Sequence, residues 1–401
     1  MYQIIEGGSI TSAKGFKAAG IFCGIKKRKK DLALIYSESS CTAAGTFTLN
    51  KVKAAPLVIS QNLIKIGKNV KAILINSGNA NACTGETGYN DALQMQKWCA
   101  EKLNILPSEV LISSTGVIGQ KLPVEKIASG LDEIITSLSS QGGFDAAEAI
   151  MTTDTKIKSF AVKLKFKYGE VTIGGIAKGS GMIMPNMATM LGFISTDALI
   201  EKNLLQEILL QSVNKSFNKI SVDGETSTND MVILLANGAS AVKIEKGTSE
   251  YEEFLLALNF ISTEMAKSIV SDGEGATKLV TIKVSGSKSQ EDADLVGKSI
   301  ANSSLVKTAI HGADANWGRI LSAAGQSGAD FDPSNVSISF NDLPILLPNY
   351  TLAIDETLAS KILSQNEFEI NINLGSGKEE CIWWTCDLSE EYVKINADYR
   401  T

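Results

Sequence analysis

The stretch VKAILIN at residues 70–76 is almost wholly apolar, and MVILLA at residues 231–236 has the same character. Strands that are covered on both faces by helices or by a second sheet have this composition, because neither face meets water. The stretch AVKLKFK at residues 161–167 instead alternates apolar residues with lysines, and a Tyr-Gly turn leads from it into VTIGG. This pattern predicts a hairpin with one face in water. Together these strands predict a layered α/β fold.

Apolar residues also recur at helical spacing in four places, which predicts four helices that each pack one face against the sheets. Thr196 and Asp197 are the candidate N-caps of the third helix. The predicted helices cover residues 91–103, residues 123–138, the stripe from Leu204 to Phe217, and residues 251–270.

The composition changes near residue 285. The stretch VSGSKSQEDADL is rich in serine and charge and poor in apolar residues, so we place a domain boundary or an exposed loop there. The last hundred residues then form a second αβ unit. Its strands are predicted at residues 368–373 and 381–388, and the terminal YVKINADYRT continues with strand-like alternation.

The charge balance of the 401-residue chain favours small-molecule chemistry. The net charge is −6, with 38 Lys and Arg against 44 Asp and Glu, which gives no electrostatic support to binding nucleic acid or a membrane surface. No stretch approaches the roughly 18 consecutive apolar residues of a membrane-spanning helix. The start MYQIIEGGSI also lacks the basic and apolar regions of a signal peptide. We therefore expect a cytoplasmic protein, whose six scattered cysteines are reduced.

The sequence contains a single histidine, His311. That count excludes metal sites built from several histidines, and no Gly-x-Ser-x-Gly elbow is present to partner His311 in a catalytic triad. Phosphate-binding loops are absent as well. We expect no metal and no nucleotide cofactor, and we interpret His311 as structural or substrate-positioning. The basic run at residues 26–30 lacks interleaved aromatics and is interpreted as a solvated loop.

Residues 174–192, GGIAKGSGMIMPNMATMLG, carry the chemistry. The segment is rich in small residues and contains one cation, Lys178, and one candidate nucleophile, Thr189. One interpretation is a Gly-rich turn that runs into a buried strand. The other is that small residues let the backbone bend at Ala188-Thr189, so that the Thr189 hydroxyl reaches the preceding carbonyl.

A threonine hydroxyl needs a base to take its proton, and an N-terminal threonine supplies one itself. Its α-amino group has an unperturbed pKa of about 7.7–8.0 and is available near neutral pH once the preceding peptide bond is cut. Self-cleavage at Ala188-Thr189 would thus create both the nucleophile and its base.

A second constellation is ISSTGVIG at residues 112–119, after the apolar VLI of a predicted strand. The backbone N–H groups of a Thr-Gly turn and the Thr115 hydroxyl would point donors at one spot and stabilise a tetrahedral oxyanion. Ser-Thr-Gly turns are common, so this motif alone decides nothing.

Taken together, these motifs closely resemble the ornithine acetyltransferase family, also called the glutamate N-acetyltransferase or arginine biosynthesis bifunctional family. The resemblance is carried first by KGSGMIMPNMATML, with Lys178 and Thr189, and it runs the whole length of the chain. The further matching stretches are AAGTFTLNKVKAAP (43–56), NSGNANACTGETG (76–88), STGVIG (114–119), AIMTTDT (149–155), SVDGETSTND (221–230), DGEGATK (272–278), HGADANWGRI (311–320) and the terminal NADYRT.

The resemblance implies a layered αββα sandwich of the self-processing type with a smaller C-terminal αβ domain. The expected parts are residues 1–188, the first chain after self-cleavage; residues 189–285, which complete the layered core; and residues 286–401, whose tail returns to the active site. It also implies a heterotetramer of two α and two β chains from self-cleavage.

The family's roles carry over residue by residue. Thr189 is then the nucleophile freed by cleavage after Ala188, and Thr115 and Gly116 form the oxyanion hole. The substrate-contacting positions implied by the resemblance are Thr152, Lys178, Thr189, Glu274, Asn396 and Thr401.

The implied reaction moves acetyl from N2-acetylornithine to Thr189 and then to glutamate by a ping-pong route. Both substrates share an α-amino acid core but carry side chains of opposite charge. We therefore assign Lys178 to the shared α-carboxylate and Glu274 to the ornithine ammonium, while Asn396 and Thr401 adapt to either. The motifs leave open whether acetyl-CoA is a second acetyl donor.

Two other interpretations remain open at this stage. The same fold family includes self-cleaving aminopeptidases and amidases, which transfer the acyl group to water, and exclusion of water decides between the two outcomes. A binding module without catalysis would require the Thr189 segment to remain uncut.

Overall fold

The computed structural model describes residues 2–184 and 190–398. The chain forms two compact units. The first unit takes in residues 1–179, 186–218 and 225–269, and the second takes in residues 180–185, 219–224 and 270–401.

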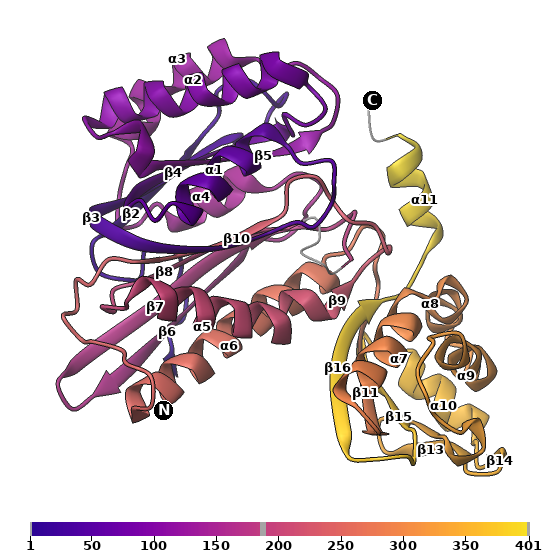
Figure 1. Cartoon of the computed structure of the whole chain (residues 1–401). Helices are drawn as coiled ribbons and strands as arrows, with labels where there is room; N and C mark the ends of the chain where they lie inside the picture. Colours follow the sequence, from indigo (N-terminus) through magenta and orange to yellow (C-terminus); the bar gives the residue numbers. More distant parts are fainter. Residues whose placement is uncertain (1, 185–189, 399–401) are drawn as a thin grey trace. The chain divides into compact units, whose positions relative to one another are not determined.

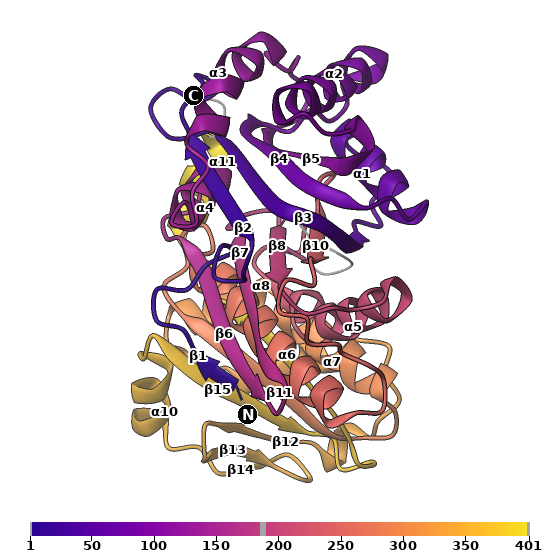
Figure 2. The same cartoon turned by 90° about the vertical axis from the view of Figure 1, so that its left-hand side faces the viewer.

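The first unit is built on a nine-stranded sheet in the order β1-β6-β7-β8-β10-β3-β4-β5, with β2 paired to β3 (Figure 2). The long strand β3 serves two parts of the sheet, because one part of it pairs with β2 and β4 and the other with β10. The strands are β1 (Tyr2–Ile4), β2 (Phe16–Ile21), β3 (Leu32–Phe47), β4 (Val70–Asn79), β5 (Val110–Val117), β6 (Lys158–Phe166), β7 (Gly169–Lys178), β8 (Leu191–Thr196) and β10 (Met231–Ala236).

Alternate residues of β3 face two different apolar cores. Leu32 and Leu34 pack with the helices α2 and α3, whereas Ala33 and Ile35 pack with α4 and with residues of β7, β8 and β10. The helices of this unit are α1 (Ala55–Lys65), α2 (Gly85–Leu103), α3 (Val124–Thr136), α4 (Gly143–Ile150), α5 (Lys202–Lys215) and α6 (Ser249–Ser271), with short 3-10 turns at Pro107–Glu109 and Phe217–Lys219.

The two parts of the sheet therefore stack across a shared core, with helices on both outer faces (Figure 1). Helices α2 and α3 cover β2, β3, β4 and β5, and α5 packs on β3 and β10. An added Cβ at Gly175 of β7 would meet Met265 of α6 at 3.0 Å, so glycine lets that helix approach the strand closely. The prediction of a layered αββα sandwich is confirmed.

The second unit is a smaller αβ unit, as predicted. Its seven-stranded sheet runs in the order β14-β13-β12-β15-β11-β16-β9. The strands are β9 (Ile220–Ser221), β11 (Leu279–Ser287), β12 (Ser337–Phe340), β13 (Leu343–Leu347), β14 (Thr351–Leu352), β15 (Glu367–Asn373) and β16 (Glu379–Cys386). The helices are α7 (Gln290–Asn302), α8 (Ser304–His311), α9 (Trp317–Gly325), α10 (Glu356–Leu363) and α11 (Glu390–Ala397), with a 3-10 turn at Pro333–Asn335.

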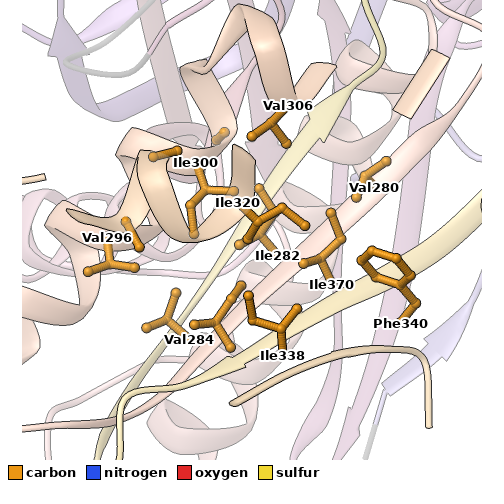
Figure 3. Close-up of a cluster of buried hydrophobic side chains, with 14 of the residues drawn as sticks. Val280, Ile282, Val284, Val296, Ile300, Val306, Ile320, Ile338, Phe340 and Ile370 are labelled. Carbon is orange, nitrogen blue, oxygen red and sulfur yellow. The ribbon is translucent and has the colours of Figure 1, made fainter. Parts of the chain in front are cut away.

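One apolar core holds the second unit together (Figure 3). Alternate residues of β11, such as Val280 and Ile282, pack against Val296 and Ile300 of α7 and against Ile370 of β15. Because these side chains are at most 1% exposed, the sheet face beneath the helices is dry and the unit has a core of its own.

Most predicted elements are confirmed, including the strands at residues 70–76 and 231–236, the hairpin of β6 and β7, and the four helices. The predicted caps of α5 are wrong. That helix begins at Lys202, and the Glu201 carboxylate accepts the N–H groups of Asn203 and Leu204. Asp197 instead accepts the N–H groups of Thr172 and Lys14, which ties the end of β8 to its neighbours.

The predicted strand-like ending at YVKIN is also wrong, because these residues form the helix α11. Ser389 precedes the helix, and Glu390 and Glu391 occupy its first turn, where negative charge complements the helix dipole. Val393 is 65% exposed, so the alternation that suggested a strand does not reflect a buried sheet face.

Residue 285, where the sequence suggested a boundary or loop, lies in β11, and α7 begins five residues later at Gln290. The compact second unit also contains residues 270–285. Among the described residues, α6 is long and apolar enough to cross a membrane. Half of its apolar window is buried, and core helices of soluble proteins pass the same test, so this is weak evidence for a span.

Candidate active site

Thr115 and Gly116 lie near the end of β5, where it pairs with β4 in the first unit. Thr115 is opposite Ser77 and Gly116 is opposite Gly78, and the register shifts at Asn79. The predicted Thr-Gly turn is therefore wrong, because both residues are still in the strand. We call residues 76–79 and 114–117 the β4–β5 edge.

Glycine is required at Gly116 for two reasons. Its φ is +131°, and an added Cβ would lie 2.4 Å from the Gly78 carbonyl carbon. Such an irregular, closely packed ladder is where strands re-aim their backbone groups beside active sites. The geometry is compatible with the predicted oxyanion hole.

Asn229 and Asp230 join the β4–β5 edge to the start of β8. The Asn229 amide donates to the Ala80 carbonyl at 2.7 Å and to the Ser114 carbonyl at 2.8 Å. The Met190 N–H donates to Asp230 Oδ1 at 3.1 Å. Two adjacent residues thus hydrogen-bond to Ser114, the neighbour of Thr115, and to Met190, which directly follows Thr189.

Asp230 is fully enclosed in this region. It is 1% exposed, and burial raises the pKa of its carboxyl well above the usual range, although the charge of Lys178 opposes the shift. Its Oδ2 atom has no hydrogen-bond partner among the described residues. This burial favours the neutral form of the carboxyl group beside the start of β8.

Asp154 organises the surroundings of Lys178 and Thr152. It accepts the ammonium of the buried Lys158 at 2.7 Å, the Gly179 N–H at 2.7 Å and the Thr152 N–H at 3.0 Å. Burial acts to raise the pKa of Asp154, but the positive charges of Lys158 and Lys178 outweigh it and hold the pKa well below the usual range. Lys178 itself is 3% exposed at the end of β7.

Glu274 and Asn396 meet in the second unit. The Asn396 amide donates to Glu274 Oε2 at 2.8 Å, and the Glu274 N–H donates to the Ser180 carbonyl at 2.8 Å. An added Cβ at Gly181 would lie 2.3–2.6 Å from the Glu274 carboxyl group, so the chain at Gly181 passes directly under it. We call residues 272–276, which carry Glu274, the Glu274 loop.

The predicted site residues therefore fall into two groups. Thr115, Gly116, Thr152 and Lys178 belong to the first unit, and Glu274 and Asn396 belong to the second. Ala188, Thr189 and Thr401 lie outside the described residues.

His311 is held in the second unit by Asp387, with 2.7 Å between Nδ1 and Oδ2. Asp387 also accepts the Thr277 N–H and hydroxyl at 2.7 Å each. This is the kind of network that fixes a loop, as the structural interpretation of His311 predicts. In the part of the chain that the structure describes, no group of three or more His, Cys, Asp or Glu side chains is arranged to hold a metal ion.

The roles of Asn229 and Asp230 are not apparent from the motif SVDGETSTND alone. Two polar residues directly before a buried strand were the available signal, since buried polar groups need specific partners. Asp154 and its ion pair with Lys158 are likewise not predicted from the sequence, because their burial becomes apparent only in the folded chain.

Comparison with known proteins gives one family match and many relatives. The model of the family described as "ArgJ family" matches residues 17–401. The arginine biosynthesis bifunctional protein ArgJ of Caldanaerobacter subterraneus is 50% identical over all of this chain and all of that protein. The protein of the same name from Dehalococcoides mccartyi is also 50% identical, over 100% of this chain and 99% of its own length.

Among the solved structures that are similar to this chain is that of an ornithine acetyltransferase from Mycobacterium tuberculosis in complex with ornithine. It is 36% identical and covers 46% of this chain and 98% of its own, with a TM-score of 0.43.

Proposed function

Because the chain belongs to the ArgJ family, we propose that it is a glutamate N-acetyltransferase of arginine biosynthesis. It moves acetyl from N2-acetylornithine to glutamate through an acetylated Thr189. The observation that carries the assignment beyond the family is the bridge made by Asn229 and Asp230. That bridge supports the proposal, because Asn229 hydrogen-bonds to Ser114, the neighbour of the proposed oxyanion donor Thr115, and Asp230 accepts the N–H of Met190, which follows the proposed nucleophile.

The reaction has two half-reactions with the same chemistry. The Thr189 hydroxyl attacks the acetyl carbonyl of N2-acetylornithine, and its proton passes to the freed α-amino group of Thr189. The Thr115 hydroxyl and the backbone of the β4–β5 edge stabilise the oxyanion. The α-ammonium group of Thr189 then returns the proton to the leaving nitrogen, so that ornithine departs as an amine. The α-amino group of glutamate then attacks the acetyl-threonine ester, which gives N-acetylglutamate and restores the hydroxyl.

Recognition is divided between shared and differing parts of the substrates. Lys178 binds the α-carboxylate that both substrates carry, and Thr152 contacts the same end, since Asp154 holds its backbone and that of Gly179. Glu274 binds the ornithine ammonium. Asn396, already hydrogen-bonded to Glu274, and Thr401 adapt to either side chain.

Self-cleavage at Ala188-Thr189 precedes the reaction. The two fragments, of 188 and 213 residues (401 minus 188), remain associated because β8 and β10 come from the second fragment. These strands lie between β7 and β3, which come from the first. We further propose that the processed protein is a cytoplasmic heterotetramer of two α and two β chains.

The relatives are named as bifunctional proteins, which supports a second acetyl donor. We include acetyl-CoA in this role, with glutamate again the acceptor. Transfer to water, as in an aminopeptidase or amidase, is the competing outcome that product analysis must separate.

The test incubates purified wild-type protein with N2-acetylornithine and glutamate, with and without acetyl-CoA, and identifies the products. Without acetyl-CoA we expect N-acetylglutamate and ornithine in equal amounts, and with acetyl-CoA we expect more N-acetylglutamate than ornithine. In both cases denaturing electrophoresis should show two fragments. Thr189→Ala should give one full-length band and no transfer. Free acetate in place of N-acetylglutamate, or cleavage that persists in Thr189→Ala, would refute the proposal.

A further inference from the structure

The basic run at residues 26–30 is not the plain solvated loop that its composition predicted. Its three central residues are exposed, but Lys26 is partly buried. The Lys26 ammonium donates to the Lys30 carbonyl at 2.8 Å and to the Met151 carbonyl at 2.5 Å. Met151 directly precedes Thr152, a proposed substrate contact.

The backbone that carries Lys26 is fixed by Asp31. This carboxylate is fully buried and accepts three N–H groups, from Cys23 at 2.6 Å, from Gly24 at 3.1 Å and from Lys26 at 2.8 Å. Hydrogen bonds to a charged acceptor are stronger than neutral ones. The position of the ammonium is therefore set by the fold.

The stem of Lys26 lies against the β4–β5 edge. An added Cβ at Gly78 would be 3.0 Å from Lys26 Cγ, and an added Cβ at Gly116 would be 2.4 Å from the Gly78 carbonyl carbon. On the same edge, the Ser77 hydroxyl donates to the Ala149 carbonyl at 2.5 Å. Lys26 thus joins the edge that carries Gly116 to the segment that carries Thr152.

The pKa of the Lys26 ammonium depends on charged groups near the proposed site, among them Lys178 and Asp154. Burial lowers the pKa of its ammonium to about 8, and the charges of Lys178 and Lys29 act in the same direction. Asp31 and Asp154 oppose the shift. Two ammonium groups that repel each other at one end of a site favour a ligand that brings negative charge.

We propose that Lys26 is a positioning residue of the acetyl-transfer site. Its ammonium holds the Met151–Thr152 segment beside the β4–β5 edge, and its charge adds to that of Lys178 in attracting the substrate carboxylate. This inference rests on the proposed function.

The test compares Lys26→Met and Lys26→Arg with a control, Lys126→Met. The Lys126 ammonium also donates to a carbonyl of this loop, that of Gly24 at 2.5 Å, but it is exposed. For Lys26→Met at pH 7 we expect the KM for glutamate to rise about tenfold, the loss typical of one charge-assisted contact, with kcat within about threefold. Lys26→Arg should retain most of the affinity, and Lys126→Met should match wild type.

The pH profile separates the charge of Lys26 from a merely structural role. In wild type the KM should rise as pH passes through about 8, because Lys26 loses its charge there. The Lys26→Arg variant stays charged, so its KM for glutamate should not rise near pH 8. The Lys26→Met variant should have a high KM that does not change with pH in this range. The groups that act on Lys26 in this range are Asp31, Lys178, Lys29 and Asp154.

A wild-type KM in Lys26→Met would overturn the inference, as would a loss of kcat at constant KM. If Lys26→Met fails to fold or to cleave itself, Lys26→Arg decides: a wild-type KM without the alkaline rise supports the inference, and any other result overturns it. If the wild-type protein transfers no acetyl group, both the proposed function and this inference are refuted. If the wild-type protein is active and only the Lys26 variants behave differently from what we expect, the inference is refuted and the proposed function stands.

Discussion

The β4–β5 edge and the Glu274 loop contribute to the proposed site in different ways. The edge consists of paired strands in which Gly116 and Gly78 approach so closely that no side chain fits between them. The loop presents a carboxylate that accepts a hydrogen bond from Asn396, on the terminal helix α11. In the proposed reaction the acetyl chemistry is the same in both half-reactions, and we assign it to the rigid backbone of the edge. The substrate side chains differ in charge, and we assign their recognition to side chains on a loop and a helix.

The largest expected effect tests the edge. Thr115→Ala should slow acetyl transfer by roughly 10² to 10³, the usual loss for one oxyanion donor. Both half-reactions should slow alike, with KM much less affected. Steady-state kinetics with each substrate varied in turn provides the measurement.

Ser113→Ala is the matched control for Thr115→Ala, because Ser113 is buried on the same strand and its hydroxyl has no partner among the described residues. It should leave the rate near wild type. If kcat and KM shift equally in Thr115→Ala, Thr115 binds ground state and transition state alike, and the edge is not an oxyanion hole.

The next effect tests the loop. Glu274→Gln should raise the KM for N2-acetylornithine by about tenfold, because an amide replaces the charged partner of the ammonium. The KM for glutamate should change much less. Removal of residues 396–401 should raise both, while self-cleavage survives in each variant.

Lys394→Met, on the exposed side of α11, controls for damage to the helix. If Glu274→Gln changes the KM for both substrates equally, the Glu274 loop does not recognise the substrate side chain, and the proposed division of roles between the edge and the loop is wrong. A truncated protein that fails to cleave would show that α11 is a folding element.

A smaller effect concerns Asp230, which connects the edge to β8. Because its pKa is raised in the folded state, its contribution to stability is fully present below the usual Asp pKa of about 3.9 and is lost as pH rises toward the folded pKa. Asp230→Asn keeps an oxygen for the Met190 N–H and cannot ionise. Its melting temperature should therefore fall less than that of wild type as pH rises above about 4, and parallel melting curves would contradict the raised pKa.

The smallest effect is expected at His311, whose side chain is 37% exposed and is held by the Asp387 carboxylate in the second unit. If the α-amino group of Thr189 is the base, activity falls as pH drops through its pKa, and His311→Asn should retain the same acidic limb. The stability cost should be about 1 kcal/mol, that of one ordinary hydrogen bond, because Asp387 keeps its hydrogen bonds to Thr277 and Lys278. Loss of the limb in a pH–rate profile would transfer the base to His311.

Local patterns predicted the elements well and their ends poorly. Continuous apolar runs fixed β4 and β10, and lysine alternation fixed the hairpin of β6 and β7. The register shift between β4 and β5 at Asn79, next to the close approach of Gly116 to Gly78, has no sequence signature beyond the glycines. At the terminus, YVKIN fits both a strand and a helix, and the acidic first turn that decides for a helix is a weaker signal than alternation.

The site was predictable only as far as the resemblance reached. Thr115, Lys178 and Glu274 came from motif positions, and their local surroundings came from the structure. The bridge by Asn229 and Asp230 depends on β10 lying beside β8, a pairing between residues forty apart that no local pattern contains. The prediction of a solvated loop is wrong for Lys26. A run of basic residues usually lies in water, but here the buried Asp31 carboxylate accepts the Lys26 N–H and fixes the backbone that carries this residue.

The sheet order of the first unit has a kinetic consequence. Strands β8 and β10 lie between β7 and β3, so a chain cut after residue 188 supplies the middle of the sheet from one molecule and both flanks from another. Before the cut, folding is a reaction of a single chain. After it, refolding becomes a second-order encounter of two polypeptides, and the melting temperature of the processed protein should depend on its concentration. Cleavage that follows folding would spare the cell this encounter, and the uncut chain would serve as its own assembly template.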